Sequence, residues 1–208
     1  MFIVSLCCRE DTNMKNVLII LGLLISNLGL NAQTPIGPKF NEKFADSLLF
    51  EKINQKRIEL GKTPYVKSDK VSKYISQRNV GIMVSKSSLF HPGYKWEDDS
   101  VMTKNVVSIY KDYKKMFPNN KNFSPSSNRP YRMTYAEVAL RGENYSYYET
   151  YEKLIDVMIQ GWYNSLGHRV ILLGDDVDLE FNQKSFIGVS IKIDKNGYYY
   201  SAANVVSF

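Results

Sequence analysis

The chain has 208 residues, of which 44% are hydrophobic and 13% are aromatic, and its formal net charge is +6. This composition excludes an intrinsically disordered chain, and the length suits one domain with a substantial hydrophobic core. Basic residues are scattered among acidic ones except over residues 111–123. This distribution favours a solvated basic face over a nucleic-acid-binding surface, so we expect a globular protein without a nucleic-acid partner.

Residues 1–32 have the pattern of an N-terminal extension followed by a secretory signal peptide. Lys15 precedes an apolar run over residues 17–25, and the small residue Ala32 lies where cleavage is expected. The run is too short for a transmembrane helix, so we expect a secreted or periplasmic protein without stable membrane insertion. The acidic residues before Met14 do not suit the start of a signal peptide, which makes Met14 a candidate start of translation.

Both cysteines, Cys7 and Cys8, lie before the expected cleavage site. The exported chain would therefore contain no cysteine, and its stability must come from its hydrophobic core without disulfides. Removal of residues 1–32 takes away two basic and two acidic residues, so the net charge of +6 is unchanged.

We predict that the exported protein begins near Gln33, because the order basic, apolar and small over residues 14–32 is that of a cleaved signal. N-terminal sequencing or the intact mass of secreted material checks this. A secreted chain that still carries Met14 would contradict it.

Two helices are predicted in the first half of the domain. Residues 33–45 form a leader, extended over the proline-containing segment 33–40, and an amphipathic helix follows. A second helical stretch is expected over residues 68–84, with His91 in the segment after it. The apolar positions of the first helix recur at three- and four-residue steps, and they are Ala45, Leu48, Leu49, Ile53 and Leu60.

The middle of the chain is less regular. Residues 92–133 are polar and rich in Asn, Ser, Pro, Tyr and Lys, which indicates an elaborated loop region with one short helix around residues 106–116. The following segment, 132–148, is compatible with either a short strand or a helix, and its sequence pattern does not decide between them.

A third amphipathic helix is predicted to begin after Thr150, which is a suitable N-cap. Asn164 and Ser165 then interrupt the apolar pattern, so we expect one helix to end there and another to begin at Ser165. His168 would lie in the first turn of this second helix. The simplest interpretation of Ser165 is that of an N-cap, and a capping hydroxyl faces its own helix, which disfavours a catalytic serine triad with His168.

The end of the chain has the period of two that is typical of strands. Apolar residues alternate with Gly, Ser or Lys over 187–193, the turn sequence DKNG follows at 194–197, and a second strand is expected over 198–208. Helices first and an antiparallel hairpin last predict an α+β domain in which helices cover the sheet.

Taken together, these segments resemble the CAP superfamily of cysteine-rich secretory, antigen 5 and pathogenesis-related proteins, in particular its bacterial secreted SCP-like branch. The resemblance covers about residues 46–208 and rests on the order of five segments. These are FEKINQKRIELGKTPY as opening helix and turn, His91 after the second helix, RGENY around Glu143, GWYNSLGHRVILL, and IGVSIKIDKNGYYYSAANVVSF as closing hairpin.

The resemblance implies a three-layer α-β-α sandwich whose cleft contains His91, Glu143 and His168. It also exposes departures from the family pattern. Ser165 stands where eukaryotic members commonly have a second glutamate, and Leu166 stands where bacterial members usually have proline. One acid of the family's site is therefore missing, and the entry to the helix at Ser165 is less preorganised.

Three kinds of chemistry are compatible with such a cleft. The expected one is binding of a small ligand, either a lipid, a peptide or a cell-wall fragment, without catalysis. In the second, His91 and His168 bind a zinc ion, which they could do through two neutral imidazole nitrogens, with Glu143 as a third or outer contact. The alternative function is that of a metal-assisted hydrolase in which Glu143 acts as general base on a water molecule.

Overall fold

The structure is a computed structural model that describes residues 33–92, 100–118, 134–173 and 185–208. Our interpretations of residues 1–32 and of most of 92–133 lie outside these ranges. The described chain belongs almost entirely to one compact unit, Pro35–Phe208. Among the described helices of that unit, none is both long and apolar enough to cross a membrane.

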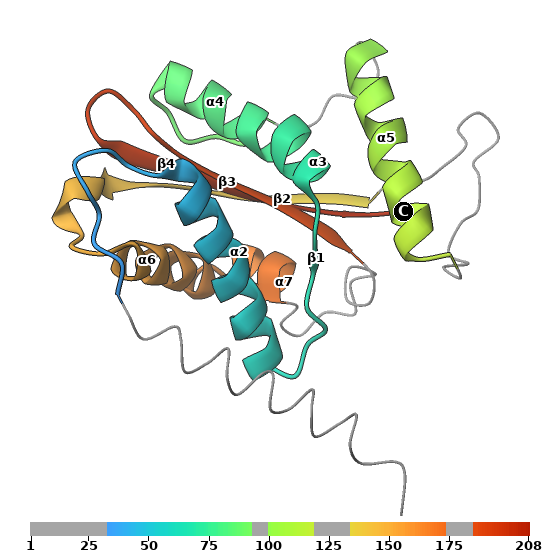
Figure 1. Ribbon diagram of the computed structural model, residues 1–208, viewed down its shortest axis with the longest axis horizontal. Helices are drawn as coiled ribbons and strands as arrows, with labels where there is room; N and C mark the ends of the chain where they lie inside the picture. The colour runs from blue at the N-terminus through green and yellow to red at the C-terminus, as the bar shows by residue number, and fades with distance from the viewer. Residues whose placement is uncertain (1–32, 93–99, 119–133, 174–184) are drawn as a thin grey trace, which may run out of the picture. The chain divides into compact units, whose positions relative to one another are not determined.

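A four-stranded mixed sheet forms the centre of the unit, with strand order β1-β3-β4-β2 (Figure 1). The strands are β1 (Val66–Lys67), β2 (Thr134–Asn144), β3 (Phe186–Ile193) and β4 (Tyr198–Ser207). β3 and β4 form the predicted antiparallel hairpin, and β2 pairs antiparallel with the other side of β4. The short β1 is parallel to β3. The α+β class predicted from the sequence is therefore confirmed.

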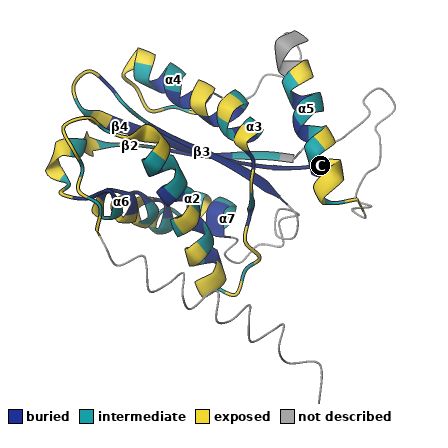
Figure 2. Cartoon of the chain, in the orientation of Figure 1, coloured by how far each residue is buried: buried dark blue, intermediate teal, exposed yellow. Residues whose placement is uncertain are grey.

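Helices cover both faces of this sheet. On one face lie α2 (Glu42–Glu59), α6 (Tyr151–Asn164) and α7 (Leu166–Leu173), and on the other lie α3 (Asp69–Val71) and α4 (Gln77–Lys86) (Figure 1). The two middle strands, β3 and β4, are largely buried, whereas the outer sides of the helices are exposed (Figure 2). This arrangement follows from the sequence, because each amphipathic helix must bury its apolar side against an apolar sheet face.

The predicted first and third helices are confirmed, with small differences at their ends. α2 begins three residues earlier than the apolar pattern indicates, because the Asn41 side chain accepts a hydrogen bond from the Phe44 backbone N–H and caps the helix. It ends before Gly61, whose φ of +69° lies in the left-handed region. At α6, Thr150 is the N-cap, as predicted, and accepts from the N–H of Lys153 at 3.3 Å.

The second helical stretch contains a π-helical segment, Ser72–Ser76, between α3 and α4. Gly188 of β3 lies directly beneath it, since a Cβ built on this glycine would be 2.3 Å from the Ser72 backbone nitrogen. The Ser72 hydroxyl also accepts a hydrogen bond from the N–H of Val189 at 3.2 Å. The π-helical turn thus lies where the helix backbone is in closest contact with the sheet.

β2 resolves the choice between strand and helix that the sequence left open. Along this strand Val138 packs with α2 and α6, while Ala139 packs with α4 on the opposite face. Alternation between two apolar layers requires an extended chain, because a helix would place neighbouring residues about 100° apart on one cylinder. Pairing along nearly the whole of β4 then fixes its register.

The short helix expected around residues 106–116 is longer in the structure, where α5 spans Ser100–Met116. Its buried residues Val106, Ile109 and Tyr113 form a second hydrophobic cluster with Phe208 at the chain end. Only one side of α5 is buried, so polar residues separate its apolar positions, and the sequence pattern showed a shorter helix than the structure contains.

A buried arginine holds the end of α7. The Arg57 guanidinium donates from Nε to the Thr63 carbonyl at 2.8 Å and from Nη1 to the Leu172 carbonyl at 2.9 Å. It also stacks on Tyr65, whose hydroxyl donates to the Ile171 carbonyl at 2.8 Å. These donors satisfy last-turn carbonyls that have no partner within the helix, and they fix the position of the helix that carries the second histidine.

Candidate functional site

The break between α6 and α7 places His168 in the first turn of α7. Ser165 lies between the two helices with φ −93° and ψ 115°, an extended conformation. Its carbonyl accepts from the N–H of Arg169 at 2.8 Å, which is the first turn of the new helix. The predicted helix end and restart are therefore confirmed, and the side-chain capping bond of Ser165 remains a prediction.

We expect Ser165→Ala to lower the free energy of unfolding by ~1 kcal/mol, the usual loss when a capping hydroxyl is removed, and Ser165→Asp to retain it. Urea unfolding of the two variants measures this difference. An alanine variant with wild-type stability would exclude the capping role.

His91 approaches the same region from the opposite face of the sheet. α4 ends at Ser87, which has a φ of 50°, and the chain turns back toward the sheet over the next residues. The rings of His91 and His168 then lie with their centroids 6.3 Å apart. In sequence these histidines are 77 positions apart (168 minus 91). The structure therefore brings together the two histidines predicted to share a site.

The acid that contacts His91 is Glu137, not the predicted Glu143. Nδ1 of His91 lies 3.1 Å from Oε1 of Glu137, and the two side chains are 54% and 4% exposed. Glu143 lies six positions further along β2 and is exposed. It is near the Tyr199 hydroxyl, whose pKa is raised mainly by burial and in small part by the charge of Glu143. A β-bulge between Arg141 and Asn144 separates this end of the strand from the regular ladder.

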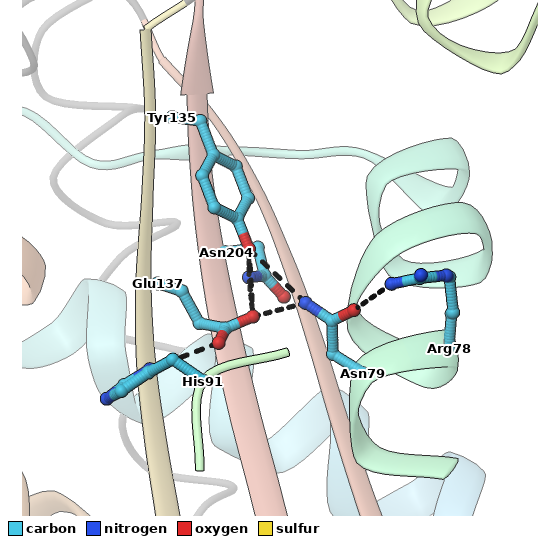
Figure 3. Close-up of polar contacts among 6 residues, drawn as sticks. All are labelled: Arg78, Asn79, His91, Tyr135, Glu137 and Asn204. Carbon is cyan, nitrogen blue, oxygen red and sulfur yellow. Dashed lines mark hydrogen bonds and ion pairs between the residues drawn. The ribbon is translucent and has the colours of Figure 1, made fainter. Parts of the chain in front are cut away.

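Three donors converge on the other oxygen of Glu137 (Figure 3). The hydroxyl of Tyr135 and the amide of Asn204 each donate to Oε2 at 2.8 Å, and the amide of Asn79 also donates to it. Tyr135 and Glu137 come from β2, Asn204 is the register partner of Glu137 on β4, and Asn79 comes from α4. We call these four residues and His91 the Glu137 network.

The two asparagines of the network have defined orientations. Nη1 of Arg78 donates to Oδ1 of Asn79 at 2.9 Å, which leaves the amide nitrogen of Asn79 to face Glu137 (Figure 3). The amide nitrogen of Asn204 also donates to the Tyr135 hydroxyl at 2.8 Å. Turning either amide around would direct its oxygen at the carboxylate, which is electrostatically unfavourable.

Burial determines the electrostatics of the site. It lowers the pKa of His168 below its usual value, and the charge of nearby His91 acts in the same direction. This favours a neutral imidazole at neutral pH. Burial also raises the pKa of Tyr135, with the charge of Glu137 next in effect, so its hydroxyl remains a proton donor.

The site offers two imidazoles to a metal ion but no complete set of ligands. Among the described residues, no group of three or more His, Cys, Asp or Glu side chains is arranged to hold a metal. Glu137 does not supply a third ligand, since Oε2 accepts three hydrogen bonds and Oε1 faces Nδ1 of His91. The residues present therefore do not fit a catalytic zinc site, which requires three protein ligands.

Two cavities lie elsewhere on the domain. One, of about 540 Å³, lies between α2 and the outer edge of β3 and includes Asp46, Lys67 and Ser72. The other, of about 340 Å³, lies between α2 and α6 around Tyr163. Neither of these two cavities is lined by His91 or His168, so the histidines lie at a surface position separate from both.

Sequence reasoning missed the Glu137 network. The segment TYAEVAL carries a polar signal that could have revealed it, because Glu137 interrupts a run that is otherwise apolar on both sides. Asn204 likewise interrupts the apolar strand SAANVVS. A polar side chain buried in the middle of a strand needs a hydrogen-bond partner. Glu137 and Asn204 are register partners, and the Asn204 amide donates to Glu137.

No protein-family model matches the chain, and no curated protein matches it. Among solved structures, an outer surface protein from Borrelia burgdorferi is similar to it, with 12% sequence identity and a TM-score of 0.48. The aligned region covers 82% of this chain and 98% of that protein.

Proposed function

We propose that the protein is a secreted, CAP-like binding domain that recognises a small ligand at the pair formed by His91 and His168. The proposal includes a lipid, a peptide or a cell-wall fragment as ligand, and it does not require catalysis. Assignment to the CAP superfamily is part of the proposal and rests on the order of the motifs around His91, Glu143 and His168.

The observation that carries the proposal is the burial of Glu137 behind an exposed histidine. A carboxylate that is only 4% exposed costs free energy to desolvate, and its replacement by an apolar residue would often be neutral or stabilising. The network compensates this cost with three donors, and it uses the remaining oxygen to hold His91. An arrangement that orients a half-exposed imidazole beside a second one is typical of a recognition site.

Titration of the histidine ring signals tests the proposal. We expect a saturable shift of the ¹H–¹⁵N ring correlations of both His91 and His168 with one of three probes: muramyl dipeptide, 1-decanol or a trialanine peptide. The matched control is Lys39→Ala, an exposed change in the leader before α2, which should leave the titration unchanged. If none of the probes shifts either ring, binding of these three classes at this site is excluded.

Weak metal binding is a second candidate because two imidazole rings lie close together, with their centroids 6.3 Å apart, and imidazole is the commonest metal ligand in proteins. We predict reversible zinc binding of modest affinity that does not hold the fold together, since the described residues offer two imidazoles and no third ligand. The affinity should fall as pH decreases through the histidine range, because ligating imidazoles must be neutral. Calorimetric titration of wild type, His91→Ala and His168→Ala measures this. Equal affinities in all three would exclude the histidine pair as a metal site.

The alternative of a metal-assisted hydrolase with Glu143 as general base has less support. Glu143 is exposed near Tyr199, and the acid against His91 is Glu137. Turnover of a peptide or ester that is sensitive to chelator and lost in Glu143→Gln, but kept in Glu149→Gln, would favour it over the binding function.

A further inference from the structure

We propose that the Glu137 network fixes the tautomer of His91, so that the site presents the bare Nε2 nitrogen and selects ligands that carry a hydrogen-bond donor or a metal cation. This inference rests on the proposed binding function for its ligand class. The tautomer itself is independent of any ligand and can be measured without one.

The two oxygens of Glu137 have different hydrogen-bond partners. Oε2 accepts from the hydroxyl of Tyr135 and from the amides of Asn79 and Asn204, which come from three different elements. A carboxylate oxygen has no further room for a fourth strong donor in this geometry. His91 therefore meets only Oε1, at 3.1 Å from Nδ1.

The contact with Glu137 determines which nitrogen of the His91 imidazole carries the proton. A carboxylate only accepts hydrogen bonds, so the contact with Oε1 requires the hydrogen of His91 to be on Nδ1. In a neutral imidazole the other nitrogen, Nε2, then carries the free lone pair. Figure 3 shows the ring of His91 extending away from Glu137, and its side chain is 54% exposed. The nitrogen that is available to a ligand is therefore an acceptor.

The hydrogen bonds of the network, and not merely the negative charge of Glu137, determine which nitrogen of His91 carries the hydrogen. In Glu137→Gln the side chain keeps its shape but has one oxygen and one NH₂ group. The amides of Asn79 and Asn204 both donate toward the Oε2 position, so the oxygen of Gln must occupy it. The NH₂ group then faces Nδ1 of His91, which must become an acceptor, and the hydrogen moves to Nε2.

The ligand class follows from the acceptor character of Nε2. A hydroxyl group, an amide N–H or a metal cation can bind to it, whereas a group that only accepts, such as a carboxylate or phosphate, finds no hydrogen on Nε2 of this tautomer. The site therefore favours neutral hydroxyl- or amide-bearing groups over anions.

The experiment is long-range ¹H–¹⁵N NMR of the imidazoles in the full domain, which distinguishes the two neutral tautomers by the shifts of Nδ1 and Nε2. We expect the neutral ring of His91 in the wild type to be the Nδ1–H form. In Glu137→Gln the two nitrogen shifts should exchange. Glu143→Gln is the matched control, and it should leave His91 in the wild-type form.

Two further measurements keep the outcomes separate. Tyr135→Phe removes one donor but leaves both amides on Oε2, so His91 should keep the Nδ1–H form. Zinc binding in Glu137→Gln should weaken about tenfold or more, as is usual when the partner that orients a ligating histidine is changed. A wild-type His91 in the Nε2–H form, or an unchanged tautomer in a folded Glu137→Gln, overturns the inference. The predicted tautomers without any ligand or zinc binding would instead contradict the proposed function.

Discussion

Gly188→Ala is expected to lower the free energy of unfolding by about 3 kcal/mol, the upper part of the range for an overpacked core. The added Cβ would lie 2.3 Å from the Ser72 backbone nitrogen and 2.5 Å from the Val71 carbonyl carbon. Both contacts are with backbone, so no side-chain rotation relieves them, and the π-helical segment must move away from β3. Urea unfolding followed by circular dichroism measures the loss.

Gly81→Ala is the matched control for this prediction. Gly81 lies within α4, and a Cβ at this position meets no atom within 4 Å. The variant should therefore gain about 0.5–1 kcal/mol, because alanine loses less conformational freedom than glycine when a helix forms. If both glycine variants change the free energy of unfolding in the same direction, the result would contradict the close contact between β3 and the π-helical segment.

The second large effect is expected at Asp46, a carboxylate at the outer edge of β3. β1 is only two residues long, so within the described part of the chain no strand pairs with Ile191 on that side, and its N–H donates to Oδ1 of Asp46 at 2.7 Å. Burial raises the pKa of Asp46 to about 7, against the opposing effects of this hydrogen bond and of Lys67 and Lys192. The charge of Glu42 adds to the increase.

The direction of the pH dependence follows from this raised value. Between the ordinary value of 3.8 and about 7, the folded state holds the Asp46 proton more tightly than the unfolded state does. The contribution of Asp46 to stability is therefore fully present below about pH 4 and is lost as pH rises through 7. A shift of roughly 3 pKa units corresponds to ~4 kcal/mol at most.

Asp46→Asn keeps an acceptor for the N–H of Ile191 but removes the titrating group. We expect this variant to match the wild type near pH 4 and to be more stable at pH 8, by up to ~4 kcal/mol. Asp156→Asn, an exposed partner of Lys52, is the control and should show no comparable pH-dependent difference. Urea unfolding at the two pH values measures both variants. A constant difference between Asp46→Asn and the wild type would contradict the raised pKa.

Local patterns in the sequence determined the helices around residues 45–60 and 150–164 and the hairpin that ends the chain. Their signals are short in range: a cap such as Thr150, an apolar period of three to four residues, or the turn DKNG between alternating residues. These signals depend only on residues close together in the sequence, so they can be recognised without knowledge of the fold. The partial burial of α5 weakened the same signal there, because only one of its sides meets the core.

The composition of the candidate site depended on long-range contacts that no local pattern contains. The motif order predicted a site of His91, Glu143 and His168. In the structure Glu137 contacts His91 instead, because the pairing of β2 with β4 places Glu137 opposite Asn204. Strand register is set by the whole hydrophobic pattern of two strands, and a shift of one residue would turn Glu137 to the other face. The identity of the acid beside His91 is therefore a property of the tertiary structure.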